Sequence, residues 1–339
     1  MRAFEDFRPG DVAEFGAYEV TREDIVAFAQ AYDPQPFHLN EAAGRVSILG
    51  GLAASGWHTA SISMRLLADH MLWDASSLGS PGIEELRWIK PVRPGEILGV
   101  RAEILGARVL KSRPAVGVLR IGLEVRAHGG ELKMSYIASI FMGRAGATVA
   151  AGSLAAAAAA LTLAAPDSLT PPPGACPDDE GVLSGWFDDL VAGRTLDLGV
   201  YEFGREEALR FAAAFDPQPF HLDDEAARRG PFGALAVSGW HTASACMARL
   251  VATRASYGEQ ARQRGLREAP KGPSPGFKDL KWLRPVLVDD RVSFTATLVD
   301  KRPTSRAGWG LAFNRCQGVN QRGEKVYEYT SASFWPMRA

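Results

Sequence analysis

The heptapeptide DPQPFHL stands at residues 33–39 and again, unchanged, at residues 216–222. A second heptapeptide, SGWHTAS, occurs at residues 55–61 and again at residues 238–244. Between Phe4 and Leu67 the two copies align without a gap at an offset of 183, and 32 of the 64 positions are identical. A repeat of this length indicates the duplication of a whole domain, because solenoid repeats are far shorter.

The rest of the chain completes two domains and a connection between them. RWIKPV at residues 87–92 matches KWLRPV at residues 281–286, where the offset has grown to 194, so the second copy carries an insertion. We expect one domain over residues 1–144, an Ala- and Pro-rich linker over 145–185, and the second domain over 186–339. Residues 145–165 are uncharged and long enough to span a bilayer, but they are mostly alanine, which favours a linker.

The composition excludes several classes of function. Among 339 residues, 38 Lys and Arg balance 39 Asp and Glu, and this near-neutral charge disfavours a nucleic-acid partner. The cysteines at 176, 246 and 316 form no CxxC pair, which argues against a disulfide framework and a zinc site. The N-terminus has no apolar signal segment. We therefore expect a cytoplasmic protein with no membrane or nucleic-acid partner.

Each copy starts with helical patterns. Thr21 is a plausible N-cap with Asp24 three residues later, and the helix that follows must end at Asp33, because Pro34 disfavours helical geometry in the residue before it. A second, apolar helix begins after Ser55.

Strands follow the helices. Four segments rich in Val and Ile are predicted as strands at 86–92, 97–105, 116–127 and 135–142. In the third strand the alternation changes register near Leu119, which indicates a bulge. Helices before a run of strands predict an α+β fold, with an antiparallel sheet around one long helix in each copy.

Asp33 and His38, repeated as Asp216 and His221, are the leading catalytic candidates. A carboxylate and an imidazole can share one water molecule as base and acid, which is the minimum for adding water to a polarised double bond. The alternative is a helix end followed by a packed loop histidine. The flanking prolines and the unchanged residues between the two groups favour the catalytic interpretation.

The start of the long helix is the second candidate. Ser55 and Ser238 would cap the helix and contact the substrate. Gly56 and Gly239 would let a ligand oxygen approach backbone N–H groups at the positive end of the helix. A plain helix start explains the same residues. The histidines that follow, at 58 and 241, are interpreted as packing residues, and no metal site is expected.

Basic residues follow the matched strands, and they could bind the phosphates of a nucleotide-like handle. We select Arg93 and Arg284 as candidates, although such residues are often only a solvated sheet face. The chain has no GxGxxG, GxxxxGK[ST] or GxSxG motif, which disfavours nicotinamide, phosphate-loop and serine-hydrolase chemistry. No cofactor is expected.

The run from Phe28 through DPQPFHL to SGWHTAS resembles the MaoC-like dehydratases, the hotdog-fold group that includes (R)-specific enoyl-CoA hydratases. The resemblance covers both copies, from near Phe4 to Met142 and from near Trp186 to Pro336, and it leaves out the linker. It implies a double hotdog whose halves pack as an intramolecular pseudo-dimer, with a further homo-oligomer left open.

By this resemblance, Asp33 and His38 activate the water that adds to a trans-2-enoyl thioester of CoA or acyl carrier protein, and Gly56 contributes to an oxyanion hole. Asp216, His221 and Gly239 take the same roles. The family usually has Asn where this chain has Gln35 and Gln218, and often His where it has Ser55 and Ser238, so the resemblance leaves the acyl preference open.

Two other functions remain open. A hotdog thioesterase commonly carries its acid on the central helix, and residues 56–68 and 239–258 contain no Asp or Glu. A non-catalytic module that binds acyl thioesters would not need two intact Asp–His pairs. Hydration of a trans-2-enoyl thioester is therefore the expected reaction.

Overall fold

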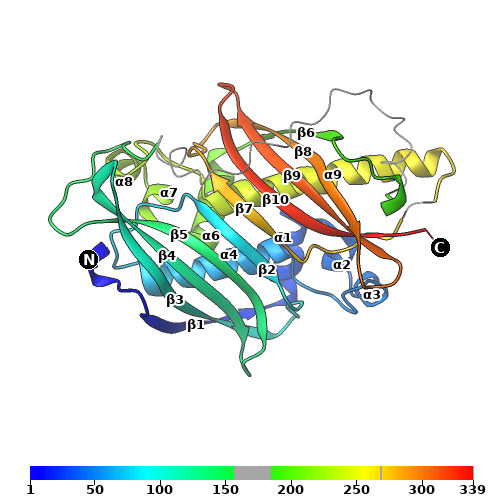
Figure 1. The fold of residues 1–339 in the computed structure, drawn as a ribbon, viewed down its shortest axis with the longest axis horizontal. Helices are drawn as coiled ribbons and strands as arrows, with labels where there is room; N and C mark the ends of the chain where they lie inside the picture. The colour runs from blue at the N-terminus through cyan, green and yellow to red at the C-terminus, as the bar shows by residue number, and fades with distance from the viewer. Residues whose placement is uncertain (156–184, 268, 339) are drawn as a thin grey trace.

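The computed structural model describes residues 1–155, 185–267 and 269–338 and shows two halves of similar architecture (Figure 1). The main elements of the first half are β1 (Val12–Val20), α1 (Arg22–Tyr32), α2 (Pro36–Leu39), α3 (Glu41–Val46), α4 (Gly56–Leu67), β2 (Gly82–Trp88), β3 (Glu96–Leu110), β4 (Arg113–Ala127) and β5 (Leu132–Gly143). Those of the second half are β6 (Thr195–Glu202), α6 (Arg205–Phe215), α7 (Pro219–Leu222), α8 (Asp224–Arg229), α9 (Gly239–Gln263), β7 (Gly276–Trp282), β8 (Arg291–Pro303), β9 (Trp309–Asn320) and β10 (Lys325–Pro336).

All ten strands form one antiparallel sheet in the order β1-β3-β4-β5-β2-β7-β10-β9-β8-β6. The halves join where β2 pairs with β7, in a register that runs from Gly82 opposite Lys281 to Arg87 opposite Gly276. Each half thereby covers the open edge that the other half would expose. The predicted α+β double hotdog, with its intramolecular pseudo-dimer, is confirmed.

The two long helices, α4 and α9, lie across the same face of this sheet (Figure 1). One cluster of buried side chains runs through both halves. Trp57 of α4 stacks on Phe277 of β7 at 5.1 Å between ring centroids, and Trp240 of α9 meets Tyr136 of β5 edge-on at 6.1 Å. Because aromatic rings bury large apolar areas, these contacts tie the halves into one core.

Several details differ from the sequence-based expectations. Each half has a fifth strand, β1 or β6, that the pattern did not reveal, because these edge strands are largely exposed and lack a clean alternation. The long helix of the first half is interrupted after Leu67, where residues 68–72 form a π-helical turn. In the second half α9 continues without a break. The insertion that distinguishes the second copy from the first comes after Leu250, where the gap-free alignment ends, and therefore lies within or after α9.

The sequence predicts a bulge near Leu119, in β4, and this prediction is wrong: the bulge lies in the neighbouring strand, β3. The pairing of β3 with β4 shifts between Ile104 and Gly106, so the extra residue, Leu105, belongs to β3. The register change in β4 has another cause: Val116 and Val118 join a separate apolar cluster that includes Leu154.

Leu154 is the only strongly apolar residue of the predicted linker to which the described structure assigns a buried position. The remainder of the linker, from residue 156 to residue 184, lies outside the described residues. Within the described ranges, no helix combines the length and apolarity needed to cross a membrane.

Candidate active site

Asp33 and His38 come together because of the local chain geometry. Asp33 is the C-cap of α1, with φ −150° and ψ 62°, and the Thr21 capping box fixes the other end of that helix. Pro36 starts the single turn α2, which carries His38. His38 Nε2 lies 3.4 Å from Asp33 Oδ2, and both residues are buried. The predicted pair is therefore formed in space.

The carboxylate of Asp33 has a fixed orientation. Ser55 Oγ donates a hydrogen bond to Oδ2 at 2.6 Å, and Gln35 Nε2 donates one to Oδ1 at 2.8 Å. The same Ser55 hydroxyl accepts from the N–H of Trp57 at 3.2 Å, so it caps α4 as it holds the carboxylate. This double role links the start of the long helix to the acid–base pair.

The imidazole of His38 has a defined tautomer. Its Nδ1 lies 2.7 Å from the carbonyl oxygen of Ala53, and a carbonyl can only accept, so Nδ1 carries the proton. In the neutral ring, Nε2 is then a hydrogen-bond acceptor beside Asp33 Oδ2. Two acceptors at 3.4 Å can share the two hydrogens of one water molecule.

The second half repeats this geometry. His221 Nε2 lies 3.4 Å from Asp216 Oδ2, and His221 Nδ1 lies 2.7 Å from the carbonyl oxygen of Ala236. Ser238 Oγ and Gln218 Nε2 donate to the carboxylate at 2.7 and 2.9 Å. Neither half has lost a member of the pair or its supports.

Asp216 is held in its charged form. Burial raises the pKa of this carboxyl, but the charge and hydrogen bond that His221 supplies when its ring is protonated, with the hydrogen bonds from Ser238 and Gln218, outweigh burial and leave the pKa below its usual value. A buried carboxylate that stays ionised near neutral pH can orient a water molecule and accept its proton.

Gly56 and Gly239 begin α4 and α9 beside these pairs. A Cβ atom on Gly56 would lie 2.3 Å from the ring of Trp88, whose Nε1 donates to the Gly56 carbonyl at 2.9 Å. Trp282 has the same relation to Gly239. Both glycines line a cleft, and within the described residues neither N–H has a hydrogen-bond partner.

Each pair opens into its own cleft, and both halves supply walls to both clefts. The first cleft, about 1470 Å³ with its mouth, contains Asp33, His38 and Gly56 and is completed by α9, β7 and β10. The second cleft, about 970 Å³ with its mouth, contains Asp216, His221 and Gly239 and is completed by α4, β2 and β5. The pseudo-dimer is thus needed to close each site.

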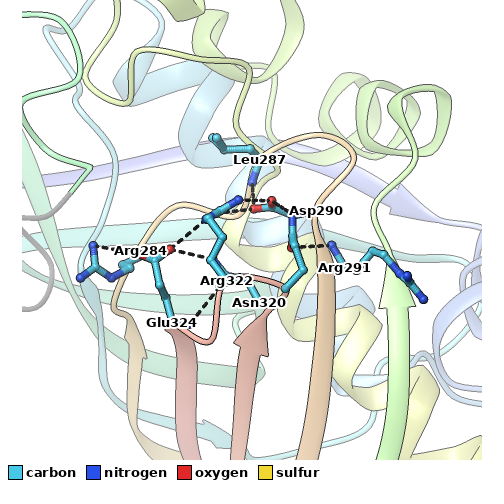
Figure 2. A network of polar contacts seen from close by, with 8 residues as sticks. Arg284, Leu287, Asp290, Arg291, Asn320, Arg322 and Glu324 are labelled. Carbon is cyan, nitrogen blue, oxygen red and sulfur yellow. Dashed lines mark hydrogen bonds and ion pairs between the residues drawn. The ribbon is translucent and has the colours of Figure 1, made fainter.

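The predicted phosphate-binding arginines lie in different surroundings. Arg284 lines the second cleft, where it pairs with Glu324 at 3.5 Å at the edge of a polar network that also contains Arg322 and Asp290 (Figure 2). Arg93 lines neither cleft, because its guanidinium donates to the carbonyl oxygens of the loop at residues 49–52. In the structure Arg93 supports this loop, and its predicted contact with the phosphates stays a prediction.

The residue that matches Arg284 in the first half is Lys90. The offset of 194 between the matched strands pairs these two positions, and this signal was available from the sequence. Lys90 lines the first cleft and forms an ion pair with Glu131. One cation therefore lies at the equivalent wall of each cleft, exposed in the case of Lys90 and half-buried in the case of Arg284.

A family model for the MaoC-like domain matches residues 6–127 and again residues 190–309, one match in each half. The chain belongs to the MaoC-like dehydratase family. The uncharacterised protein YdeM of Bacillus subtilis is 28% identical over 136 residues, which are 38% of this chain and 95% of YdeM. Protein MaoC of Klebsiella aerogenes is 32% identical over 99 residues, which are 29% of each chain.

Several solved structures match both MaoC-like halves, and two of them illustrate the likeness. A MaoC domain protein from Chloroflexus aurantiacus has a TM-score of 0.76 at 16% identity, and the match covers 100% of this chain and 98% of that protein. A double-hotdog protein of Mycobacterium tuberculosis has a TM-score of 0.69 at 15% identity, with 98% of each chain covered. At these identities the likeness establishes the shared fold.

The structure also assigns places to the remaining MaoC-like site residues. Ser55 and Ser238 are buried, donate to the carboxylates of Asp33 and Asp216, and line neither cleft. Their predicted contact with substrate stays a prediction. The histidines at 58 and 241 stack against Phe28 and Phe211 at 4.6 and 4.7 Å, in agreement with a packing role. Within the described ranges, no three His, Cys, Asp or Glu residues are grouped as a metal site.

Proposed function

We propose that the protein adds water to trans-2-enoyl thioesters, and removes it from (R)-3-hydroxyacyl thioesters, at two sites. The observation that carries this proposal is the duplicated, buried Asp–His pair beside an unpaired helix N–H in a cleft. Three functions that the reaction needs, namely to hold water, to move a proton and to receive negative charge, have a candidate group in each half.

In the first site, the water would sit against Asp33 Oδ2 and His38 Nε2. Its oxygen attacks C3 of the enoyl group while one of its protons passes to this pair. The pair then returns a proton to C2, so the thioester gains one hydroxyl and one hydrogen. Groups of this kind contribute about 10²–10⁴ in rate.

Negative charge develops on the thioester oxygen during the attack. The N–H of Gly56 would receive that charge, supported by the positive end of α4. A single donor of this kind contributes about 10²–10³ in kcat. The second site would use Asp216, His221 and Gly239 in the same way.

The substrate handle would be CoA or an acyl carrier protein. Lys90 in the first cleft and Arg284 in the second are the proposed contacts for its phosphate groups, because both line a cleft and a cation at this wall is common to the two halves. No resident cofactor is required for the reaction.

Crotonyl-CoA tests this proposal. The purified full-length chain should consume the enoyl absorbance and form 3-hydroxybutyryl-CoA of the R configuration without releasing free thiol. Release of thiol in step with substrate loss would instead identify a thioesterase. Binding of crotonyl-CoA without turnover would identify a non-catalytic module.

A further inference from the structure

The two clefts share their reacting groups but differ in the wall supplied by the opposite half. At an offset of 193, Tyr136 of β5 matches Tyr329 of β10, and both line a cleft. Further along the same strands, Ala138 and Ile140 line the second cleft, whereas serines at the matching positions line the first. The first cleft therefore has a polar wall where the second has an apolar wall.

The long helices increase this difference. In the second cleft the end of the α4 segment contributes Leu67 and Leu72. In the first cleft α9 contributes Leu250, which matches Leu67, and then Arg254. In each cleft, this wall comes from the half that does not carry the acid–base pair. It is apolar in the second cleft, whereas in the first cleft it includes a cationic side chain.

Arg254 has no carboxylate partner among the described residues. Its guanidinium lies over the ring of Trp335 at 4.8 Å from the centroid, and the side chain is half-buried. The indole Nε1 of Trp335 donates to Ser333 Oγ at 2.9 Å, which leaves the Ser333 hydroxyl proton without an acceptor among those residues. One tryptophan therefore brings an unpaired guanidinium and a free hydroxyl donor to the same region of the wall.

These donors select for a negatively charged, planar group. A guanidinium presents parallel N–H donors that match a carboxylate, and partial burial strengthens the contact. Among the described residues that line the first cleft, Asp33 is the only acidic one, whereas Lys90, Arg254 and Arg306 are cationic. Burial lowers the pKa of Arg254, and a substrate carboxylate beside the guanidinium would favour its charged form.

We propose that the first cleft accepts enoyl thioesters whose acyl chain ends in a carboxylate, whereas the second accepts apolar chains. This inference rests on the proposed hydratase function and assigns a substrate class to each site. Arg254 is the specificity-determining residue, with Ser333 as a second donor. The cleft also continues past Arg254, because Leu250, Arg254, Gly272 and Phe334 line an adjoining hollow of the described structure.

The experiment isolates one site at a time. The Asp216→Asn variant leaves the first pair intact, and the Asp33→Asn variant leaves the second. Each is assayed with trans-2-hexenedioyl-CoA and trans-2-octenedioyl-CoA, and with the matching trans-2-hexenoyl-CoA and trans-2-octenoyl-CoA. Within a matched couple, the substrates differ only in a terminal carboxylate or methyl group.

The expected result is opposite selectivity. Asp216→Asn should favour the diacid substrates in kcat/KM by about tenfold or more, and Asp33→Asn should favour the neutral ones. Adding Arg254→Met to Asp216→Asn should lower kcat/KM on the diacids about ten- to a hundredfold and invert the preference, because a charge-assisted hydrogen bond is lost. Arg254→Lys should retain part of the preference.

Arg262→Met is the matched control, because Arg262 lies on the same helix, is exposed, and lines neither cleft. It should keep the diacid preference of Asp216→Asn. Equal selectivity in the two Asp→Asn variants, or a diacid preference that survives Arg254→Met with an unchanged melting temperature, overturns the inference and leaves the hydratase function standing. No hydration of any of the four substrates by the unmodified chain overturns the hydratase function itself.

Discussion

Replacing Ser238 with alanine should weaken the second site and the fold together. Its hydroxyl donates to Asp216 Oδ2 at 2.7 Å and accepts from the N–H of Trp240 at 3.3 Å. A hydrogen bond to a buried charged group contributes about 1.5–3 kcal/mol, and an N-cap about 1 kcal/mol. Because one hydroxyl makes both contacts, we expect a loss of about 2–3 kcal/mol in the free energy of unfolding.

The same change should alter the pH dependence. The Ser238 hydrogen bond is one of the interactions that lower the pKa of Asp216, so its removal moves that pKa upward. A carboxyl with a lowered pKa stabilises the fold above its unfolded pKa, and this stabilisation is lost as pH falls through the folded pKa. The stability deficit of Ser238→Ala should therefore be full near neutral pH and shrink in acid.

The assay uses an Asp33→Asn background so that only the second site turns over. The acid limb of the kcat/KM profile for crotonyl-CoA should move to higher pH, and kcat/KM near neutral pH should fall about tenfold. Ser244→Ala is the matched control, because among the described residues this buried hydroxyl on the same helix bonds only to the Trp240 carbonyl, at 2.8 Å. An unmoved acid limb with unchanged activity would show that Ser238 does not hold the carboxylate.

Three further predictions concern other parts of the molecule. Gly239→Ala should cost about 1–3 kcal/mol in thermal unfolding and silence the second site, because the new Cβ would lie 2.5 Å from the ring of Trp282; a fully active variant would contradict this packing. Arg284→Ala should raise KM for crotonyl-CoA but not for a crotonyl-pantetheine thioester. Arg93→Ala should lower the melting temperature with little effect on KM. A raised KM for crotonyl-CoA in Arg93→Ala, with an unchanged KM in Arg284→Ala, would instead identify Arg93 as the contact for the CoA phosphates. Burial raises the pKa of Glu207, but His241, 3.5 Å away, and hydrogen bonds from Tyr201 and Tyr32 bring it down to about 2. The stability difference between the unmodified chain and Glu207→Gln should therefore be present above pH 4.5 and diminish towards pH 2 in acid-unfolding curves.

The sequence predicted the parts of the site that depend on short-range order. Pro34 predicts that a helix ends at Asp33, and the structure confirms this. The segment after it was expected to be extended, but Pro36 instead starts the single helical turn that carries His38. The duplication made the result stronger, since the unchanged heptapeptides pointed to function in both halves. The joint between the halves followed from the open edge that a single sheet would leave.

The features that depend on long-range packing were not predictable. The weak pattern of β1 reflects an edge strand whose residues are mostly exposed. Arg93 looked like a substrate contact, because nothing in the sequence indicates that its guanidinium binds the carbonyls of a loop some 40 residues earlier. The role of Arg254 depends on a wall that one half supplies to the other half's cleft, and only the folded pseudo-dimer reveals that wall.

The most direct test of the account compares the two Asp→Asn variants with the double variant in crotonyl-CoA hydration. Each single variant, Asp33→Asn or Asp216→Asn, should keep measurable activity, because the other pair is intact, and Asp33→Asn should keep the larger share because crotonyl-CoA has an apolar chain. The double variant should have no measurable activity and an unchanged circular dichroism spectrum, since each missing group contributes about 10²–10⁴ in rate. A double variant that still hydrates crotonyl-CoA would contradict the assignment of the Asp–His pairs as the catalytic groups.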